Sequence, residues 1–118
     1  MARPRKNNLG VFAAGEIPFS FVHYFTTKDS SGNKVPIDLT GWTASITFSG
    51  PVETSSYGTG TLSITDAVNG EVTYAWAAAD FFDVGKYEFL IWVTDGTNRL
   101  ASDLNVYEVY DGPGATPT

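Results

Sequence analysis

The sequence contains no cysteine, a single histidine and no apolar run near the ~20 residues needed to cross a bilayer. The missing cysteine excludes a disulfide scaffold and cysteine-based metal sites. One histidine, His23, also cannot supply the three protein ligands that a catalytic zinc ion usually has. We therefore expect no metal, no cofactor and no membrane insertion.

Targeting signals are also missing from the sequence. The N-terminal segment MARPRKNNLG is basic, but no apolar stretch and no small-residue cleavage site follow it, so we expect no secretory signal. The chain has no Asn-x-Ser/Thr glycosylation sequon. Both absences fit synthesis in a cytoplasm.

Basic residues are few and unevenly placed. The chain has 7 Lys and Arg against 13 Asp and Glu, for a formal net charge of −6. Nucleic-acid binders usually present a basic face, so this balance argues against nucleic acid as the partner. Three of the basic residues are Arg3, Arg5 and Lys6. This basic arm could dock on the acidic body of a neighbouring copy, or it could be a solvated terminus.

The 118 residues are 42% hydrophobic and 14% aromatic, which is typical of one globular domain. Short segments alternate apolar and polar residues between turn residues, and none has helical periodicity. Such segments cover residues 17–25, 35–39, 42–48, 61–65, 71–76, 86–94 and 99–110. This pattern predicts an all-β sandwich of about seven to eight antiparallel strands. We expect a basic arm over residues 1–14, the sandwich over 15–111 and a flexible tail over 112–118.

Two strands give sharper expectations. The first long one would place five residues on one side: Ile17, Phe19, Phe21, His23 and Phe25. The strongest would bury one alternating set of side chains: Tyr87, Phe89, Ile91 and Val93. Its other face would then present Leu90 and Trp92 to the outside.

The stretch DVGKYEF has the spacing of an immunoglobulin-type corner, with Asp83, Gly85 and Tyr87. In such a corner a tyrosine near the start of the sixth strand hydrogen-bonds to backbone a few residues upstream. Phe89 stands where a cysteine is usual. Burying a phenylalanine contributes about 1.5–3 kcal/mol, comparable to the ~2–4 kcal/mol of a typical disulfide. The sequence thus predicts an immunoglobulin-like β-sandwich without its disulfide, with Trp42 as its central tryptophan.

The outward face of the sixth strand is the main candidate site. We expect Tyr107 and Val109 on the last strand to point outward beside Leu90 and Trp92. Exposed Trp and Tyr are favoured interface anchors, so this face predicts contact with another chain. The alternative is that the N-terminal segment LGVFAAGE of the same chain covers it.

Longer strings resemble the immunoglobulin-like domain at the N-terminus of phage baseplate upper proteins. The matching points are Ile37 to Gly41, Thr65 to Val72, Ala79-Asp80, Gly85 to Tyr87 and Asp95-Gly96. The resemblance implies a structural, non-enzymatic virion component of a tailed phage, in the tail, baseplate, neck or capsid surface. Other virion proteins and further copies of this chain would be its partners. Proteins of this family continue into a part that carries receptor-binding protein, and we expect no such bridging from a chain ending at Thr118.

Other chemistry has weaker support. His23 with a serine could suggest hydrolysis, but no serine lies in a nucleophile elbow, and a half-buried structural histidine is expected. Aspartates in polar turns, such as Asp29 and Asp95, could hold calcium, but local turn capping explains them better. The alternative to assembly is a carbohydrate-binding module for host glycans, with sugars stacked on Trp92, Tyr57 or Tyr110.

Overall fold

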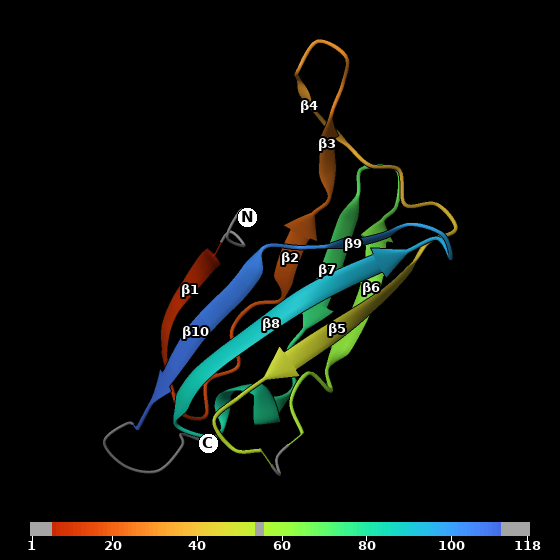
Figure 1. The fold of residues 1–118 in the computed structure, drawn as a ribbon. Helices are drawn as coiled ribbons and strands as arrows, with labels where there is room; N and C mark the ends of the chain where they lie inside the picture. The colour runs from red at the N-terminus through yellow and green to blue at the C-terminus, as the bar shows by residue number, and fades with distance from the viewer. Residues whose placement is uncertain (1–5, 54–55, 112–118) are drawn as a thin grey trace.

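The computed structural model describes residues 6–53 and 56–111, and this part of the chain is all-β. It contains ten strands and one short 3-10 helix, arranged as in Figure 1. The elements are β1 (Lys6–Ala13), β2 (Phe21–Tyr24), β3 (Thr26–Lys28), β4 (Lys34–Pro36), β5 (Thr43–Ser49), β6 (Thr61–Asp66), β7 (Glu71–Ala75), η1 (Ala78–Phe81), β8 (Gly85–Thr94), β9 (Arg99–Ala101) and β10 (Leu104–Tyr110).

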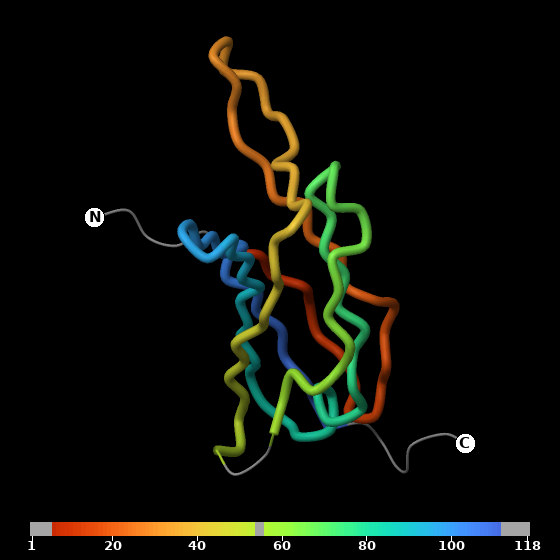
Figure 2. Tube along the Cα trace, turned by 90° about the vertical axis from the view of Figure 1, so that its right-hand side faces the viewer, coloured from red at the N-terminus to blue at the C-terminus, as the bar shows by residue number. Residues whose placement is uncertain are grey.

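The strands form two facing sheets and a separate hairpin. The larger sheet has the order β1-β10-β8-β5, with β9 also paired to β8, and the smaller sheet has the order β2-β7-β6. Figure 2 shows the two layers side by side, with the β3–β4 hairpin projecting beyond them. The turn of this hairpin is held by the Asp29 carboxylate, which accepts hydrogen bonds from the amides of Ser31 and Asn33.

The strand β8 buries the side chains that its alternation predicts. Tyr87, Phe89, Ile91 and Val93 are all at most 1% exposed. Each intervening residue points away from the smaller sheet, because successive side chains of a strand alternate between its two faces.

The hydrogen bond predicted from Tyr87 to the backbone a few residues upstream is present. The Tyr87 hydroxyl donates to the Asp83 backbone carbonyl at 2.5 Å. Gly85 has a φ of 142°, and a Cβ there would lie 2.5 Å from Cβ of Pro51, so only glycine fits the backbone path. Phe89 lies in the core as expected and stacks on Phe48 with ring centroids 5.1 Å apart.

The N-terminal segment differs from the prediction. Residues 1–14 were expected to be an arm, but Lys6–Ala13 is strand β1, which pairs with β10 in parallel. The expectation of antiparallel strands throughout is therefore wrong. Burial explains the pairing, because the Phe12 ring packs edge-on against Phe81 and Tyr107, with centroids 5.1 and 5.9 Å away. Arg3, Arg5 and the predicted tail 112–118 lie outside the described residues.

The first predicted long strand is shorter than expected. It begins at Phe21, while Ile17 and Phe19 are 64% and 98% exposed. Pro18 has no N–H to give to a ladder, and the Trp76 indole donates to the Phe19 carbonyl at 2.9 Å. The backbone before Phe21 is therefore held by a side chain and not by a neighbouring strand.

An aromatic cluster fills the space between the sheets. Trp42 and Trp76 are both partly buried, but the tryptophan at the centre of the ring contacts is Trp76. Trp76 packs edge-on against aromatic rings of both sheets and of η1: Phe21, Tyr74, Phe81, Phe89 and Tyr107. The expectation for Trp42 is wrong because this residue lies just before β5, the edge strand of the larger sheet, and packs at the margin of the core.

Candidate functional site

The outer face of the larger sheet carries the candidate site. Leu90 and Trp92 on β8 point outward and are half-buried, as expected for neighbours on a sheet surface. The Trp92 indole donates to the hydroxyl of Thr47 on β5 at 2.9 Å, which fixes the ring against the sheet. Whether they bind a partner stays a prediction.

The outward placement of Tyr107 and Val109 is wrong. They are 3% and 1% exposed and lie in the core. In the β10–β8 ladder, Tyr107 is opposite Tyr87 and Val109 is opposite Gly85. Opposite residues share a face, so Tyr107 must point inward with Tyr87. Its ring stacks on that of Tyr87 at 4.7 Å with an angle of 6° between the planes.

Leu104 and Val106 take the outward positions of β10, and both are half-buried. Together with Leu90 and Trp92 they form an apolar strip across β8 and β10, which we call the docking face. Leu104 and Val106 were not among the predicted outward residues, because the prediction placed the other alternating set of β10 outward.

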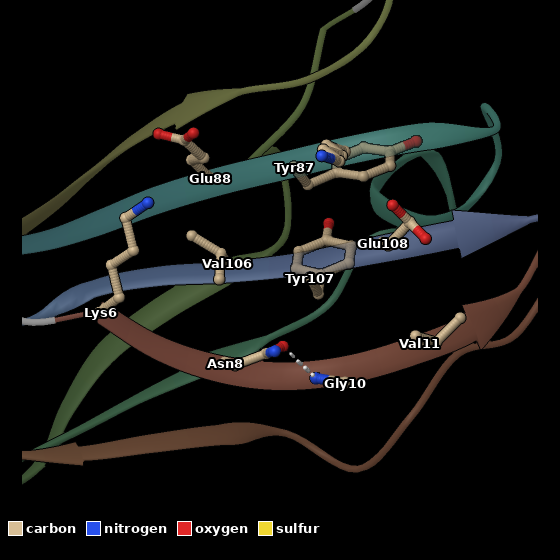
Figure 3. A pocket seen from close by; sticks show the side chains of 10 residues that line it. Lys6, Asn8, Gly10, Val11, Tyr87, Glu88, Val106, Tyr107 and Glu108 are labelled. Carbon is tan, nitrogen blue, oxygen red and sulfur yellow. Dashed lines mark hydrogen bonds between the residues drawn. The ribbon is translucent and has the colours of Figure 1, made fainter.

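Shallow hollows lie on both sides of the docking face. One of about 360 Å³ is lined by β1, β10 and β8, and Figure 3 shows Lys6, Glu88, Glu108 and Val106 around it. Another of about 370 Å³ is lined by Trp92, hydroxyl groups and Arg99. An apolar strip with a polar and charged margin is the usual composition of a protein–protein interface.

A buried polar cluster supports the sheets from within. The Asp80 carboxylate, which is 0% exposed, accepts hydrogen bonds from the Gly58 amide (2.8 Å), the Tyr74 hydroxyl (2.6 Å) and the Ala77 amide (3.0 Å). Its backbone carbonyl accepts the Tyr107 hydroxyl at 2.5 Å. These bonds join η1 to β7 of the smaller sheet and to β10 of the larger one, and among the described residues no buried side-chain polar atom lacks a partner.

The tyrosines near this cluster should make the free energy of unfolding depend on pH in the alkaline range. Burial raises the pKa of the Tyr74, Tyr87 and Tyr107 hydroxyls, and the charge of Asp80 raises that of Tyr107 further. Below pH ~10, the ordinary tyrosine pKa, their contribution is fully present. Above it the unfolded chain loses protons that the fold retains, so the free energy of unfolding should fall by up to ~1.4 kcal/mol per pH unit for each tyrosine.

Urea unfolding between about pH 8 and pH 11 measures this effect. The variant Tyr107→Phe is the control, because it should remove the contribution of Tyr107 to the fall of the free energy of unfolding with pH. A free energy of unfolding that stays level across this range in the unaltered chain would contradict the expectation.

The other candidates have structural roles. His23 packs edge-on against Phe25 at 4.6 Å, and burial lowers its pKa while the charge of Asp103 opposes this. The Asp95 carboxylate accepts the amides of Thr97 and Asn98, which lowers its pKa and caps the turn. Among residues 6–53 and 56–111, no group of His, Asp and Glu could hold a metal ion.

These features define the class of the protein, a small all-β module with an aromatic core and a mixed apolar and polar outer face. In the described ranges, no helix has the length and apolar character that a membrane crossing requires. The chain belongs to the family of the BppU N-terminal domain, which matches residues 31–111. This confirms the resemblance to phage baseplate upper proteins. The match begins in the turn of the β3–β4 hairpin, so β1, β2 and β3 precede it.

The family defines the setting of the chain. Its members are structural, non-catalytic proteins of the phage baseplate, and their partners are other virion proteins. The chain is accordingly a baseplate component of a phage particle. No curated protein matches the chain significantly.

Proposed function

We propose that the chain is a structural component of a tailed-phage particle that docks onto neighbouring virion proteins through the docking face. The observation that carries this proposal is the half-buried apolar strip of Leu90, Trp92, Leu104 and Val106 on the outer side of the larger sheet. The segment LGVFAAGE, the alternative cover, contributes to β1 at the edge of the sheet instead. It therefore leaves Leu90 and Trp92 for another chain.

We infer that the fold is an immunoglobulin-like sandwich. Three observations support this: the strand order of the two sheets, the Tyr87 corner, and the aromatic packing of Phe89 in place of a disulfide. The smaller sheet corresponds to the second, fifth and fourth strands of such a domain, and β5, β8 and β10 correspond to the third, sixth and seventh. The hairpin β3–β4 is then an insertion after the second strand.

The basic residues are a second element of the proposal. Lys6 lines the hollow beside Val106, so a neighbour bound at the docking face would meet a positive charge there. Arg3 and Arg5 precede it in the sequence. We propose that these three residues contact acidic groups of a neighbouring virion subunit.

The geometry gives no support to the glycan alternative. The Tyr57 ring packs against Phe48 and Tyr87, and its hydroxyl donates to the Asp83 carboxylate at 2.7 Å. Tyr110 lies near the start of β8 in the sheet and Trp92 near its end, so they are separated by roughly 25 Å. A sugar chain that stacks on several aromatic rings needs those rings to lie close together and in a common plane.

Assembly of virions tests the docking face. The chain is supplied to a phage whose own copy of this gene is inactivated, and its amount in purified particles is measured. The double variant Leu90→Arg/Trp92→Glu should be incorporated at least about tenfold less than the unaltered chain, because buried unpaired charges oppose docking. The matched control is Val22→Arg/Tyr24→Glu on the outer face of the smaller sheet, where both residues are exposed. Thermal melts establish that both variants fold. Equal incorporation of both variants would refute the proposed surface.

A further inference from the structure

The free edge of β5 is unlike the other edges of the two sheets. Strand edges expose unpaired backbone groups, and proteins usually protect them with bulges, short strands, charges or proline. Among the described strands, β1 has a bulge between Asn8 and Val11 that contains Gly10 at φ 110°, and β6 has one between Ile64 and Asp66. The edge strand β2 has only 4 residues.

None of these protections is present in β5. Its 7 residues, Thr43–Ser49, have the sequence TASITFS, with no charge, proline or glycine, and they pair with β8 without a bulge. No described strand lies beyond β5 in the larger sheet. Figure 2 is viewed from this side, and β5 lies there at the edge of its layer that is nearest the viewer.

The hydrogen bonds of β8 determine which β5 groups are free. The Ile91 amide donates to the Ser102 hydroxyl at 3.0 Å, and the Ile91 carbonyl accepts the Ser102 amide at 2.8 Å. The backbone N–H and C=O groups of Ile91 thus point toward β9 and β10. Because backbone groups alternate sides along a strand, Leu90 and Trp92 direct theirs toward β5. Their opposite residues there are Thr47 and Ser45.

It follows that Ala44, Ile46 and Phe48 direct their N–H and C=O groups to the free edge. No hydrogen bond joins these groups to any other described residue outside the strand ladders. The free groups therefore belong to the residues whose side chains face the core, while Thr43, Ser45, Thr47 and Ser49 present hydroxyls on the outer face.

We propose that β5 pairs with β5 of a second copy of this chain, antiparallel and with Ile46 opposite Ile46 on a two-fold axis. In this register Ala44 lies opposite Phe48, so every free group at the edge finds a partner. The side chains match as well. Apolar residues meet apolar residues on the inner face, and Ser45 meets Thr47 while Thr43 meets Ser49 on the outer face.

Several observations favour a second copy over a strand of a different protein. The pattern reads the same in both directions, with hydroxyl residues at 43, 45, 47 and 49 and apolar residues between them. This is the self-complementarity that a two-fold interface requires. The strand is uncharged, so two copies that each carry a net charge of −6 do not repel one another at the contact itself.

The pairing would join two larger sheets into one and double the docking face. A single strand edge buries less than the ~1,200 Å² of a standard interface, so the dimer should be weak in isolation. Repetition within a particle would offset that weakness through avidity. The inference does not depend on the docking face, and variants of Leu90 and Trp92 should leave the dimer intact.

Sedimentation equilibrium of the chain from about 10 µM to 1 mM, near physiological salt, tests the inference. The unaltered chain should approach twice the mass of one chain. Ser45→Lys/Thr47→Lys should weaken the dimer about tenfold or more, because residue 45 of one copy then faces residue 47 of the other with like charge. The matched control is Ser45→Lys/Thr47→Glu, which sets opposite charges face to face and should keep the dimer.

Ala44→Pro provides an independent variant. It removes an N–H that faces the free edge, where proline is tolerated in a strand, and should also abolish the dimer. If this variant fails to fold, the two charge variants decide, since residues 45 and 47 are exposed. A monomer at all concentrations of the unaltered chain overturns the proposal. A dimer that survives equally in both charge variants also overturns it, because another surface must then hold the copies together.

Discussion

Replacing Asp80 with alanine should lower the free energy of unfolding by roughly 3–5 kcal/mol. The carboxylate is fully buried and accepts hydrogen bonds from Gly58, Tyr74 and Ala77. Its removal leaves three donors without a partner, and each buried unpaired group costs about 1–3 kcal/mol. Urea denaturation followed by fluorescence measures the loss through the shift of the midpoint.

Asp38→Ala is the matched control for this experiment. The Asp38 carboxylate also accepts hydrogen bonds, from the amide and the hydroxyl of Thr40, but the residue is exposed. Water can replace its hydrogen bonds, so we expect a loss within about 1 kcal/mol. If Asp80→Ala lowered the free energy of unfolding no more than Asp38→Ala does, the buried cluster would not be what joins η1 to the sheets.

Replacing Phe89 with alanine should cost about 3–5 kcal/mol, as truncation of a buried phenylalanine usually does. The ring is 1% exposed and packs against Phe48, Phe21 and Trp76 at centroid distances of 5.1, 5.2 and 5.5 Å. It connects the two sheets at the position where the proposed immunoglobulin-like fold would usually have a cysteine. The cost comes from the lost burial and from the cavity that the remaining rings cannot fill.

Phe82→Ala provides the comparison, because the Phe82 side chain is 72% exposed beside the same corner. Its loss should change the free energy of unfolding by no more than about 0.5 kcal/mol. Parallel chemical denaturation of both variants gives the difference directly. Similar losses of free energy of unfolding in the two variants would show that the packing of Phe89 does not stabilise the fold as a disulfide would.

The sequence predicted the elements that depend on local signals. The strand β8 and its corner were predicted because their alternation and turn residues lie within a few positions of one another. The pair Asn69-Gly70 is a further local signal, suited to a turn with positive φ, and Gly70 has a φ of 71°. From β8 alone, Leu90 and Trp92 could be placed on the outer face.

The misses have physical causes that a single sequence conceals. In LNVYEVY both alternating sets contain apolar residues, and a shift of one residue reverses the faces, so Tyr107 and Val109 were placed outward. The strand β1 pairs with a strand about a hundred residues further along the chain, shown by Asn7 and Asn105, which are 98 positions apart. Its own residues, KNNLGVFA, carry little local preference for a strand.

The parallel pairing of β1 with β10 has a mechanical consequence. Because the two strands run in the same direction, the start of β1 at Lys6 and the end of β10 at Tyr110 lie at opposite ends of the pair. Tension between these two points acts along the strands and loads the hydrogen bonds of the ladder together, in shear. A hairpin pulled from its open end would instead lose its bonds one at a time. A baseplate component that its neighbours pull at both ends of this pair would therefore bear the load in the more resistant of the two arrangements.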